Sequence, residues 1–204
     1  MSTKTDLKKL DAYRARAGEW RELELESARY LAIDGAGDPN TEVFTRAVEA
    51  LYPAAYALKF LSKVDLGRDY VVPPLEGLWW AEDLDAFTRH RDKSRWLWTL
   101  MILVPEWLED EHAAEALDRA RAKRPAGSLG DVRLERLDEG RCVQTLHVGA
   151  FDDEGPVLAR LHDEHLPAHG LRPSGKHHEI YLSDFRRVEP ARRRTILRQP
   201  VVCA

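Results

Sequence analysis

The chain has 204 residues, of which 44% are hydrophobic and 32% charged, the composition of a soluble globular protein. Its net charge of -4 argues against a dedicated nucleic-acid binder. Two cysteines without a Cys-x-x-Cys pair fit a reduced compartment and provide no disulfide framework. The N-terminus lacks a signal-peptide core, and the apolar run 96–104 is too short to span a membrane. We expect a cytoplasmic monomer or homodimer without nucleic-acid or membrane partners.

Hydrophobic periodicity and turn residues define the elements of the first half. Pro53 predicts a kink or a restart in a long helix there. The predicted elements are a short charged helix or arm at 6–17, a strand at 22–33, a turn at 34–40, a helix at 41–64, a strand at 71–80, a polar loop at 83–92 and a buried strand at 95–104.

The second half repeats this order of elements. It is predicted to contain a helix at 110–124, strands at 132–137 and 142–148, a helix at 157–169, and strands at 177–182 and 192–202. Strand, turn, helix, strand, strand thus occurs twice, which indicates an internal duplication of β-α-β-β units. We predict an α+β fold in one domain, with an arm at 1–20 and repeats at about 21–108 and 130–204. The two repeats would be related by a pseudo-twofold axis, form an antiparallel sheet and leave a ligand cleft.

The strand at 71–80 carries two adjacent tryptophans after two prolines. Because neighbouring side chains of a strand point to opposite faces, Trp79 and Trp80 should face different surroundings, with Glu76 on the side of Trp80. Pro73 and Pro74 cannot donate ladder hydrogen bonds, so this strand should be at an edge or bulged. Large aromatic residues beside a carboxylate indicate the wall of a pocket.

Three other patterns favour structural interpretations. The Gly-rich turn at 34–40 lacks the third glycine of a dinucleotide motif and the Lys-Ser/Thr of a P-loop. His162, His165 and His169 could share a helix face, but a solvated face is favoured over a metal site, because no His-Glu-x-x-His motif is present. The arginine-rich stretch 186–198 lacks a helix-turn-helix pattern and interleaved aromatics. We therefore predict no metal and no cofactor.

Glu179 is a carboxylate between apolar neighbours in a predicted central strand. Alternation places His177, Glu179 and Tyr181 on one face of that strand. A buried unpaired carboxylate is costly, so it must be paired, protonated or functional. Pairing with Arg194 of the next strand and a functional role are both open on the sequence alone.

Four segments together resemble the GyrI-like small-molecule-binding family. They are residues 30–40 (YLAIDGAGDPN), 73–80 (PPLEGLWW), 176–184 (KHHEIYLSD) and 195–201 (TILRQPV). The resemblance implies two β-α-β-β repeats around a ligand cleft. Some family members are effector domains of multidrug-sensing regulators, but this chain resembles stand-alone members, which either bind drugs or hydrolyse cyclopropane-bearing DNA-alkylating compounds. It also implies an aromatic cage and a glutamate at the position of Glu179.

Two functional hypotheses follow. In the first, a flat aromatic ligand stacks in the cage, Glu179 or Glu76 accepts a proton from a water that attacks the cyclopropane carbon, and Tyr181, Tyr52 or His147 donates to the dienone oxygen as the ring opens to a phenol. The aromatic ligand is the only partner required. In the second, the same cage binds lipophilic cations without catalysis. A third possibility is an interaction protein whose aromatic residues only form the hydrophobic core.

The candidate residues fall into two groups. The catalytic candidates are Glu179, Tyr181 and Glu76. The ligand-binding candidates are Trp79, Trp80, Trp96, Trp98, Tyr52, Tyr56, Phe60, His147 and Phe185.

Overall fold

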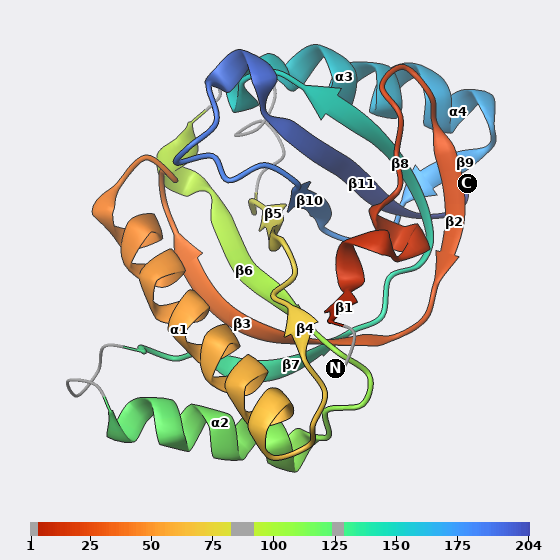
Figure 1. The fold of residues 1–204 in the computed structure, drawn as a ribbon. Coiled ribbons are helices and arrows are strands. Elements are labelled where there is room, and N and C mark those ends of the chain that lie inside the picture. Colours follow the sequence, from red (N-terminus) through yellow and green to blue (C-terminus); the bar gives the residue numbers. More distant parts are fainter. Residues whose placement is uncertain (1–3, 83–91, 124–128) are drawn as a thin grey trace. The chain divides into compact units, whose positions relative to one another are not determined.

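The computed structural model describes residues 4–82, 92–123 and 129–204 (Figure 1). By its internal contacts the chain divides into two compact units. The first unit comprises Met1–Lys9, Ala28–Pro73 and Ala81–Leu137, and the second comprises Leu10–Ser27, Pro74–Trp80 and Asp138–Ala204. Both units combine helices with antiparallel strands. The prediction of an α+β fold with an antiparallel sheet is therefore confirmed.

In the first unit, β3 (Ala28–Ala36) pairs antiparallel with β6 (Leu97–Val104) on one side and β7 (Arg133–Leu137) on the other. Helix α1 (Glu42–Val64) contacts β3, β6 and the second helix α2 (Asp110–Ala122). The remaining elements are short: β1 (Thr5–Asp6), which pairs in parallel with β4 (Tyr70–Val71), and the 3-10 turns η1 (Leu7–Lys9) and η4 (Lys93–Arg95).

Trp98 of β6 organises the core of this unit. Its side chain is fully buried and packs edge-on against Phe44 of α1, with ring centroids 5.2 Å apart. A Cβ at Gly35, which lies opposite Trp98 in the β3–β6 register, would overlap the indole ring. Glycine at position 35 therefore allows the large ring to lie directly on the neighbouring strand.

The second unit is built on five antiparallel strands. Their order is β2 (Arg21–Leu25), β8 (Gly140–Val148), β11 (Arg194–Cys203), β10 (His177–Tyr181) and β5 (Leu75–Trp80), and β9 (Leu171–Pro173) pairs with the end of β11. Three short 3-10 turns complete this unit: η2 (Asp11–Tyr13), η5 (Phe151–Asp153) and η7 (Pro190–Arg192).

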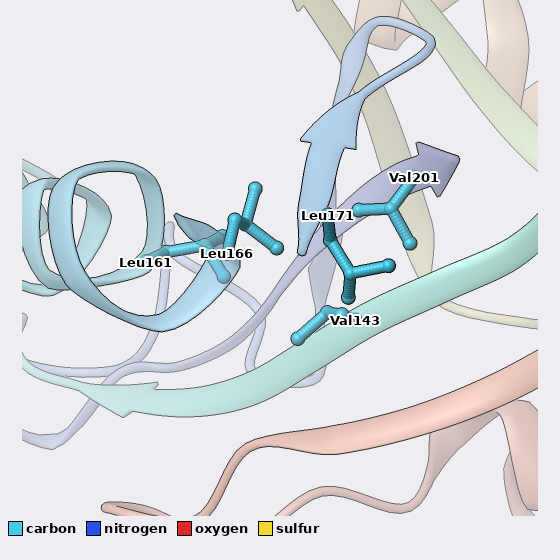
Figure 2. Packing of buried hydrophobic residues seen from close by; sticks show 5 residues of the cluster. All are labelled: Val143, Leu161, Leu166, Leu171 and Val201. Carbon is cyan, nitrogen blue, oxygen red and sulfur yellow. The ribbon is translucent and has the colours of Figure 1, made fainter. Parts of the chain in front are cut away.

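A helical segment covers one face of this sheet. It consists of α3 (Gly155–Ala159), the π-helical turn η6 (Arg160–His165) and α4 (Leu166–Ala168). Figure 2 shows how Leu161 and Leu166 from this segment lie against the strands, where they form a buried cluster with Val143, Leu171 and Val201. Burial of such aliphatic side chains is what holds a helix on a sheet.

Several local predictions differ from the structure. The short charged helix or arm predicted at 6–17 consists of β1, η1 and η2, and the single strand predicted at 22–33 is two strands, β2 and β3. The two strands pair with different partners, β2 with β8 and β3 with β6 and β7, and they differ in burial: β2 alternates between half-buried and exposed residues, whereas the middle of β3 is continuously buried. Helix α1 continues through Pro53. The predicted loop at 83–92 falls almost entirely outside the described residues.

The order β-α-β-β does recur along the chain, as β3, α1, β5, β6 and as β8, α3 to α4, β10, β11. Strand β5, however, belongs by its contacts to the second unit, where it pairs with β10. The repeat boundaries at 21–108 and 130–204 stay a prediction. In the part of the chain that the structure describes, no helix combines the length and apolarity needed to cross a bilayer.

Candidate functional site

The pairing of β5 with β10 sorts the candidate residues onto two faces of the second unit's sheet. In this register Trp79 lies opposite His177 and Gly77 opposite Glu179, whereas Glu76 lies opposite Ile180. Directly opposed residues of an antiparallel pair point to the same side. We call the side of Trp79, His177, Glu179 and Tyr181 the helix face. The side of Glu76, His178 and Arg198 is the network face.

The helix face continues onto the neighbouring strands in register. Glu179 lies opposite Leu197 of β11, so the alternative partner Arg194 is not its cross-strand neighbour. Val143 and Val201 lie on the same side as Glu179, and they pack against the helical segment. The helix face is therefore the one that α3 to α4 covers.

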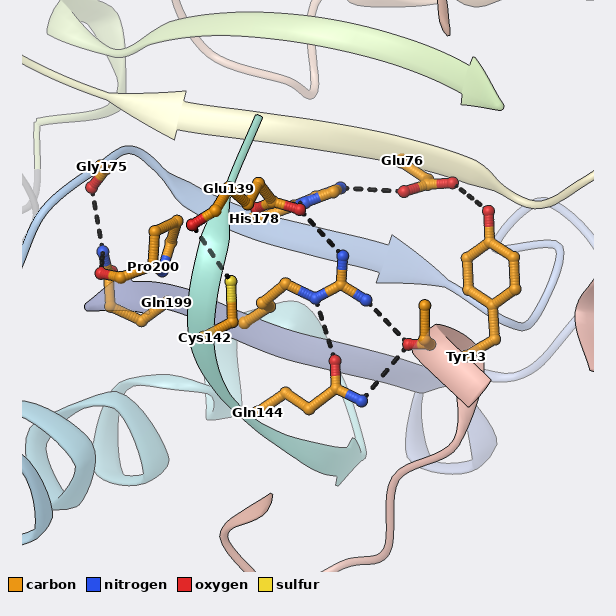
Figure 3. A network of polar contacts seen from close by, with 11 residues as sticks. Tyr13, Glu76, Glu139, Cys142, Gln144, Gly175, His178, Gln199 and Pro200 are labelled. Carbon is orange, nitrogen blue, oxygen red and sulfur yellow. Dashed lines mark hydrogen bonds and ion pairs between the residues drawn. The ribbon is translucent and has the colours of Figure 1, made fainter. Parts of the chain in front are cut away.

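The network face holds a chain of buried charges around His178 (Figure 3). The Nε2 atom of His178 lies 2.9 Å from Glu76 Oε2, and its Nδ1 lies 2.9 Å from Glu139 Oε1. Tyr13 donates to the other oxygen of Glu76 at 2.5 Å. Glu76 and His178 are fully buried, so each of these charges depends on its partners for stabilisation.

Arg198 extends this network towards the N-terminal part of the chain. Its Nη1 pairs with Glu139 Oε2 at 2.9 Å, its Nε donates to Gln144 Oε1 at 2.9 Å, and its Nη2 donates to the carbonyl of Ala12 at 2.7 Å. Gln144 also donates to the carbonyls of Ala12 and Arg14. The network thus attaches η2 to the sheet of the second unit.

The charges of the network stabilise one another. Burial alone would lower the pKa of His178, but Glu139 and Glu76 raise it to about 9. Burial alone would raise the pKa of Glu139, but His178 and Arg198 lower it to about 2. At neutral pH, His178 is therefore an imidazolium between two carboxylates, an arrangement in which it neither accepts nor releases a proton readily.

The helix face carries a shorter polar chain. Trp79 Nε1 donates to Tyr181 Oη at 3.0 Å, and Tyr181 Oη donates to Glu179 Oε2 at 2.9 Å. A Cβ at Gly77 would lie 2.9 Å from Trp79 Nε1 and 3.0 Å from Tyr181 Oη, so glycine at this position makes room for the contact. Burial raises the pKa of Tyr181 well above its usual value, and Glu179 adds to the effect.

His177 completes this group beside Glu179. Its Nε2 lies 3.8 Å from Glu179 Oε1, and the two side chains are 16% and 13% exposed. Burial lowers the pKa of His177 to about 3, with smaller contributions from His162 and His178. The imidazole is therefore neutral at physiological pH, in contrast to its neighbour in sequence.

Aromatic rings lie around Tyr181. Phe151 and Phe185 contact it edge-on, with centroids at 5.5 Å and 6.2 Å, and Arg193 lies 5.2 Å from the Phe151 ring centroid. Phe185 is among the predicted binding residues. Phe151 was not predicted, because it lies in a turn whose only sequence signal is its flanking glycines and aspartates.

Two further predicted residues of this unit have defined partners. The exposed Lys176 lies 3.3 Å from the ring centroid of the half-buried Trp80, whereas Trp79 is buried, so the two tryptophans do face different surroundings. His147 is buried with Nε2 3.0 Å from the carbonyl of Ala150. Glu76 shares the side of Trp80, as alternation predicts, and is thereby on the opposite face from Glu179.

The other predicted residues belong to the first unit. Trp98 is a core residue, and the half-buried Trp96 has Lys93 5.9 Å from its ring centroid. Tyr52, Tyr56 and Phe60 lie on α1 along an open groove of about 850 Å³ beside Arg119, Ala120 and Lys123 of α2 and its end. Tyr56 and Phe60 are exposed.

The histidines at 162–169 and the arginine-rich stretch, for which the sequence favoured structural interpretations, have the following surroundings. Among residues 4–82, 92–123 and 129–204, no group of three or more His, Cys, Asp or Glu side chains could hold a metal ion. His165 stacks against His169 at 4.1 Å and against Trp20 at 5.2 Å. Of the arginine-rich stretch, Arg198 is buried in the network and Arg193 donates to the carbonyls of Val188 and Phe185.

Comparison with known proteins identifies relatives along the whole chain. Residues 19–201 match the family described as the GyrI-like small molecule binding domain. An uncharacterized conserved protein from Listeria innocua is 38% identical, with a TM-score of 0.86 over 98% of this chain and 100% of that chain. A hydrolase from Listeria innocua is 37% identical, with a TM-score of 0.84 and the same coverage.

A more distant structure shares the fold alone. The C-terminal domain of EcmrR is 9% identical, with a TM-score of 0.56 over 91% of this chain and 98% of that chain. No protein with a curated description matches the chain significantly.

Proposed function

The chain belongs to the GyrI-like small-molecule binding domain family, and on that basis we propose that it hydrolyses cyclopropane-bearing, DNA-alkylating aromatic compounds at the helix face. The observation that carries this proposal is the chain of contacts from Trp79 through Tyr181 to Glu179. It provides a carboxylate base and a phenol proton donor side by side. The description of a 37% identical protein as a hydrolase supports a catalytic role. Such an activity would protect the cell from these compounds.

The proposed reaction adds one water across a carbon–carbon bond. The water oxygen attacks the cyclopropane methylene carbon while Glu179 accepts one of its protons. The ring bond breaks, and its electron pair moves through the conjugated ring to the carbonyl oxygen, which becomes a phenolate. Tyr181 protonates that oxygen, and the proton on Glu179 then returns to Tyr181 across their 2.9 Å contact.

The surroundings of Glu179 suit these steps. The raised pKa of Tyr181 keeps its phenol protonated at neutral pH, and this pKa falls once Glu179 has accepted the water proton, because the negative charge that helps to raise it is then neutralised. The indole N–H of Trp79 stabilises the tyrosine oxygen while its proton is away. The rings of Phe151 and Phe185, together with the tyrosine, would stack with a flat ligand, each contributing about 0.5–1.5 kcal/mol beyond buried area.

The experiment is incubation with a cyclopropane-bearing alkylator, followed by mass analysis for the addition of one water. The wild type should convert the compound, and Glu179→Gln should lose at least about 100-fold in rate while still quenching tryptophan fluorescence on ligand binding. Glu189→Gln, which changes an exposed glutamate of the same unit, is the matched control and should react normally. Unchanged turnover by Glu179→Gln would sink the assignment of the base.

Non-catalytic binding of lipophilic cations is the second candidate. The contacts of Tyr181 with Phe151, Phe185 and the Glu179 carboxylate favour it, because rings and a carboxylate together attract a desolvated cation. In that case rhodamine-type dyes should quench the tryptophans, Glu179→Gln should weaken binding, and the alkylator should be recovered without the addition of water.

A further inference from the structure

His177 is a half-buried histidine whose two ring nitrogens are buried and have unused hydrogen-bonding capacity. Neither ring nitrogen has a hydrogen-bond partner among the residues that the structure describes. Buried polar atoms are nearly always paired, because leaving one unpaired costs about 1–3 kcal/mol. His178, the next residue, is held on both ring nitrogens by carboxylates. Its ion pairs therefore explain why a histidine occupies position 178, whereas no comparable contact explains the histidine at position 177.

The position of His177 beside Glu179 indicates a role for its ring nitrogens. It is two residues from Glu179 on the same face, and its Nε2 lies 3.8 Å from Glu179 Oε1. That separation is too long for a direct hydrogen bond. It does allow one small group to lie within hydrogen-bonding distance of both atoms, as when a single water links a base to a second polar group.

We propose that His177 is a second catalytic residue, which holds the attacking water together with Glu179. This inference rests on the proposed hydrolysis. In the tautomer with its proton on Nδ1, the lone pair of Nε2 accepts one hydrogen of the water, and Glu179 Oε1 accepts the other. As the oxygen bonds to the cyclopropane carbon, the proton facing Glu179 is transferred. The hydrogen facing His177 stays on the oxygen and becomes that of the product hydroxyl.

The environment of His177 suits this role. A neutral imidazole has a free lone pair, whereas an imidazolium would be a donor on both nitrogens and would orient a water with its oxygen towards the ring. Burial and the neighbouring His162 and His178 keep the ring neutral. The same burial favours Glu179 over His177 as the group that takes the proton.

The test compares two substitutions of one residue. His177→Phe keeps the ring and removes both nitrogens, and His177→Gln restores an acceptor near the position of Nε2. His169→Gln changes an exposed histidine of the same unit and is the matched control. For each variant, kcat is measured with the cyclopropane-bearing alkylator, ligand affinity by tryptophan quenching, and Tm by thermal unfolding.

We expect kcat to fall about 100-fold in His177→Phe, with ligand affinity within about threefold of wild type, and to recover at least tenfold of that loss in His177→Gln. The Tm of His177→Phe should be equal to or higher than that of the wild type, because an unpaired polar group is replaced by an apolar ring of similar shape. The control should match the wild type in kcat and affinity.

Each other outcome counts against the inference in a recognisable way. If Glu179→Gln is inactive while His177→Phe keeps full kcat, the role of His177 is wrong and the proposed function stands. An equal loss in His177→Phe and His177→Gln, or a loss confined to ligand affinity, also contradicts it. A large fall in Tm for both variants would assign His177 to the core. No water addition by the wild type would overturn both proposals.

Discussion

Two adjacent histidines on one strand of the second unit have opposite electrostatic states. His178 on the network face is charged, because Glu76 and Glu139 contact its two nitrogens, and its pKa is raised to about 9. His177 on the helix face is neutral, with a pKa lowered to about 3. The ring nitrogens of both histidines are buried, so the difference comes from the partners that each face supplies.

The comparison distinguishes a buried polar cluster that stabilises the fold from one that can act on a ligand. On the network face each charge has a counter-charge, and the cluster attaches η2 to the sheet. On the helix face, Glu179 receives the Tyr181 hydrogen bond and lies beside an imidazole with unused nitrogens. Incomplete pairing of this kind is more typical of functional sites than of cores.

The largest effect is expected from breaking the network face. His178→Gln leaves Glu76 and Glu139 buried without the cation between them, which should cost about 3–5 kcal/mol of unfolding free energy. Urea denaturation measures it. His177→Phe is the matching substitution on the helix face and should leave the free energy of unfolding unchanged. Equal losses of unfolding free energy in the two variants would contradict the distinction between the two faces.

The pH dependence of stability should also separate the two histidines. The raised pKa of His178 contributes stability that is complete below pH 6.5 and is lost as the pH rises through about 9. The lowered pKa of His177 acts in the other direction, so that stability falls as the pH drops from 6.5 towards about 3. Thermal unfolding measured across this pH range should show a fall of Tm at both ends, an alkaline limb from His178 and an acid limb from His177.

His177→Phe should weaken only the acid limb of that profile. The lowered pKa of Glu139, which contributes stability that is lost as the pH falls from 4.5 towards about 2, should leave part of that limb in place. A variant profile identical to the wild type between pH 6.5 and 3 would show that His177 is not buried neutral.

A smaller effect is expected at Gly77, where the helix face is tightly packed. An alanine Cβ would press on Trp79 and Tyr181, and overpacking of this kind costs about 1–3 kcal/mol. Gly77→Ala should also lower turnover by displacing Tyr181 from Glu179. Gly155→Ala, where the added Cβ would meet no atom within 4 Å, is the matched control for both measurements.

An effect of similar size on the free energy of unfolding is expected at the end of the network. Tyr13→Phe removes one hydrogen bond to Glu76 and should cost about 1.5–3 kcal/mol at most, the range for a bond to a charged group. Tyr56→Phe alters an exposed tyrosine and should leave the unfolding free energy unchanged. Turnover should be unaffected in Tyr13→Phe, since Tyr13 lies on the network face.

The alternation of side chains along single strands was sufficient to predict part of the candidate site on the helix face. Alternation along residues 177–182 placed His177, Glu179 and Tyr181 on one face, and the structure has them there. It also placed Trp79 and Trp80 on different faces. It could not join Trp79 to Tyr181, because that contact depends on the register between β5 and β10, strands about a hundred residues apart in the chain.

The fold was predicted to a similar extent. The sequence by itself determined the α+β class, most helices and strands, and the membership suggested by four long motifs. Only the tertiary structure decided that β2 and β3 are separate strands, that the last helix contains a π-helical turn, and that Glu76 meets His178, Glu139 and Arg198. Periodicity reports which side a residue faces, whereas the partner it meets there depends on strand pairing, and strand pairing determined which histidine is charged.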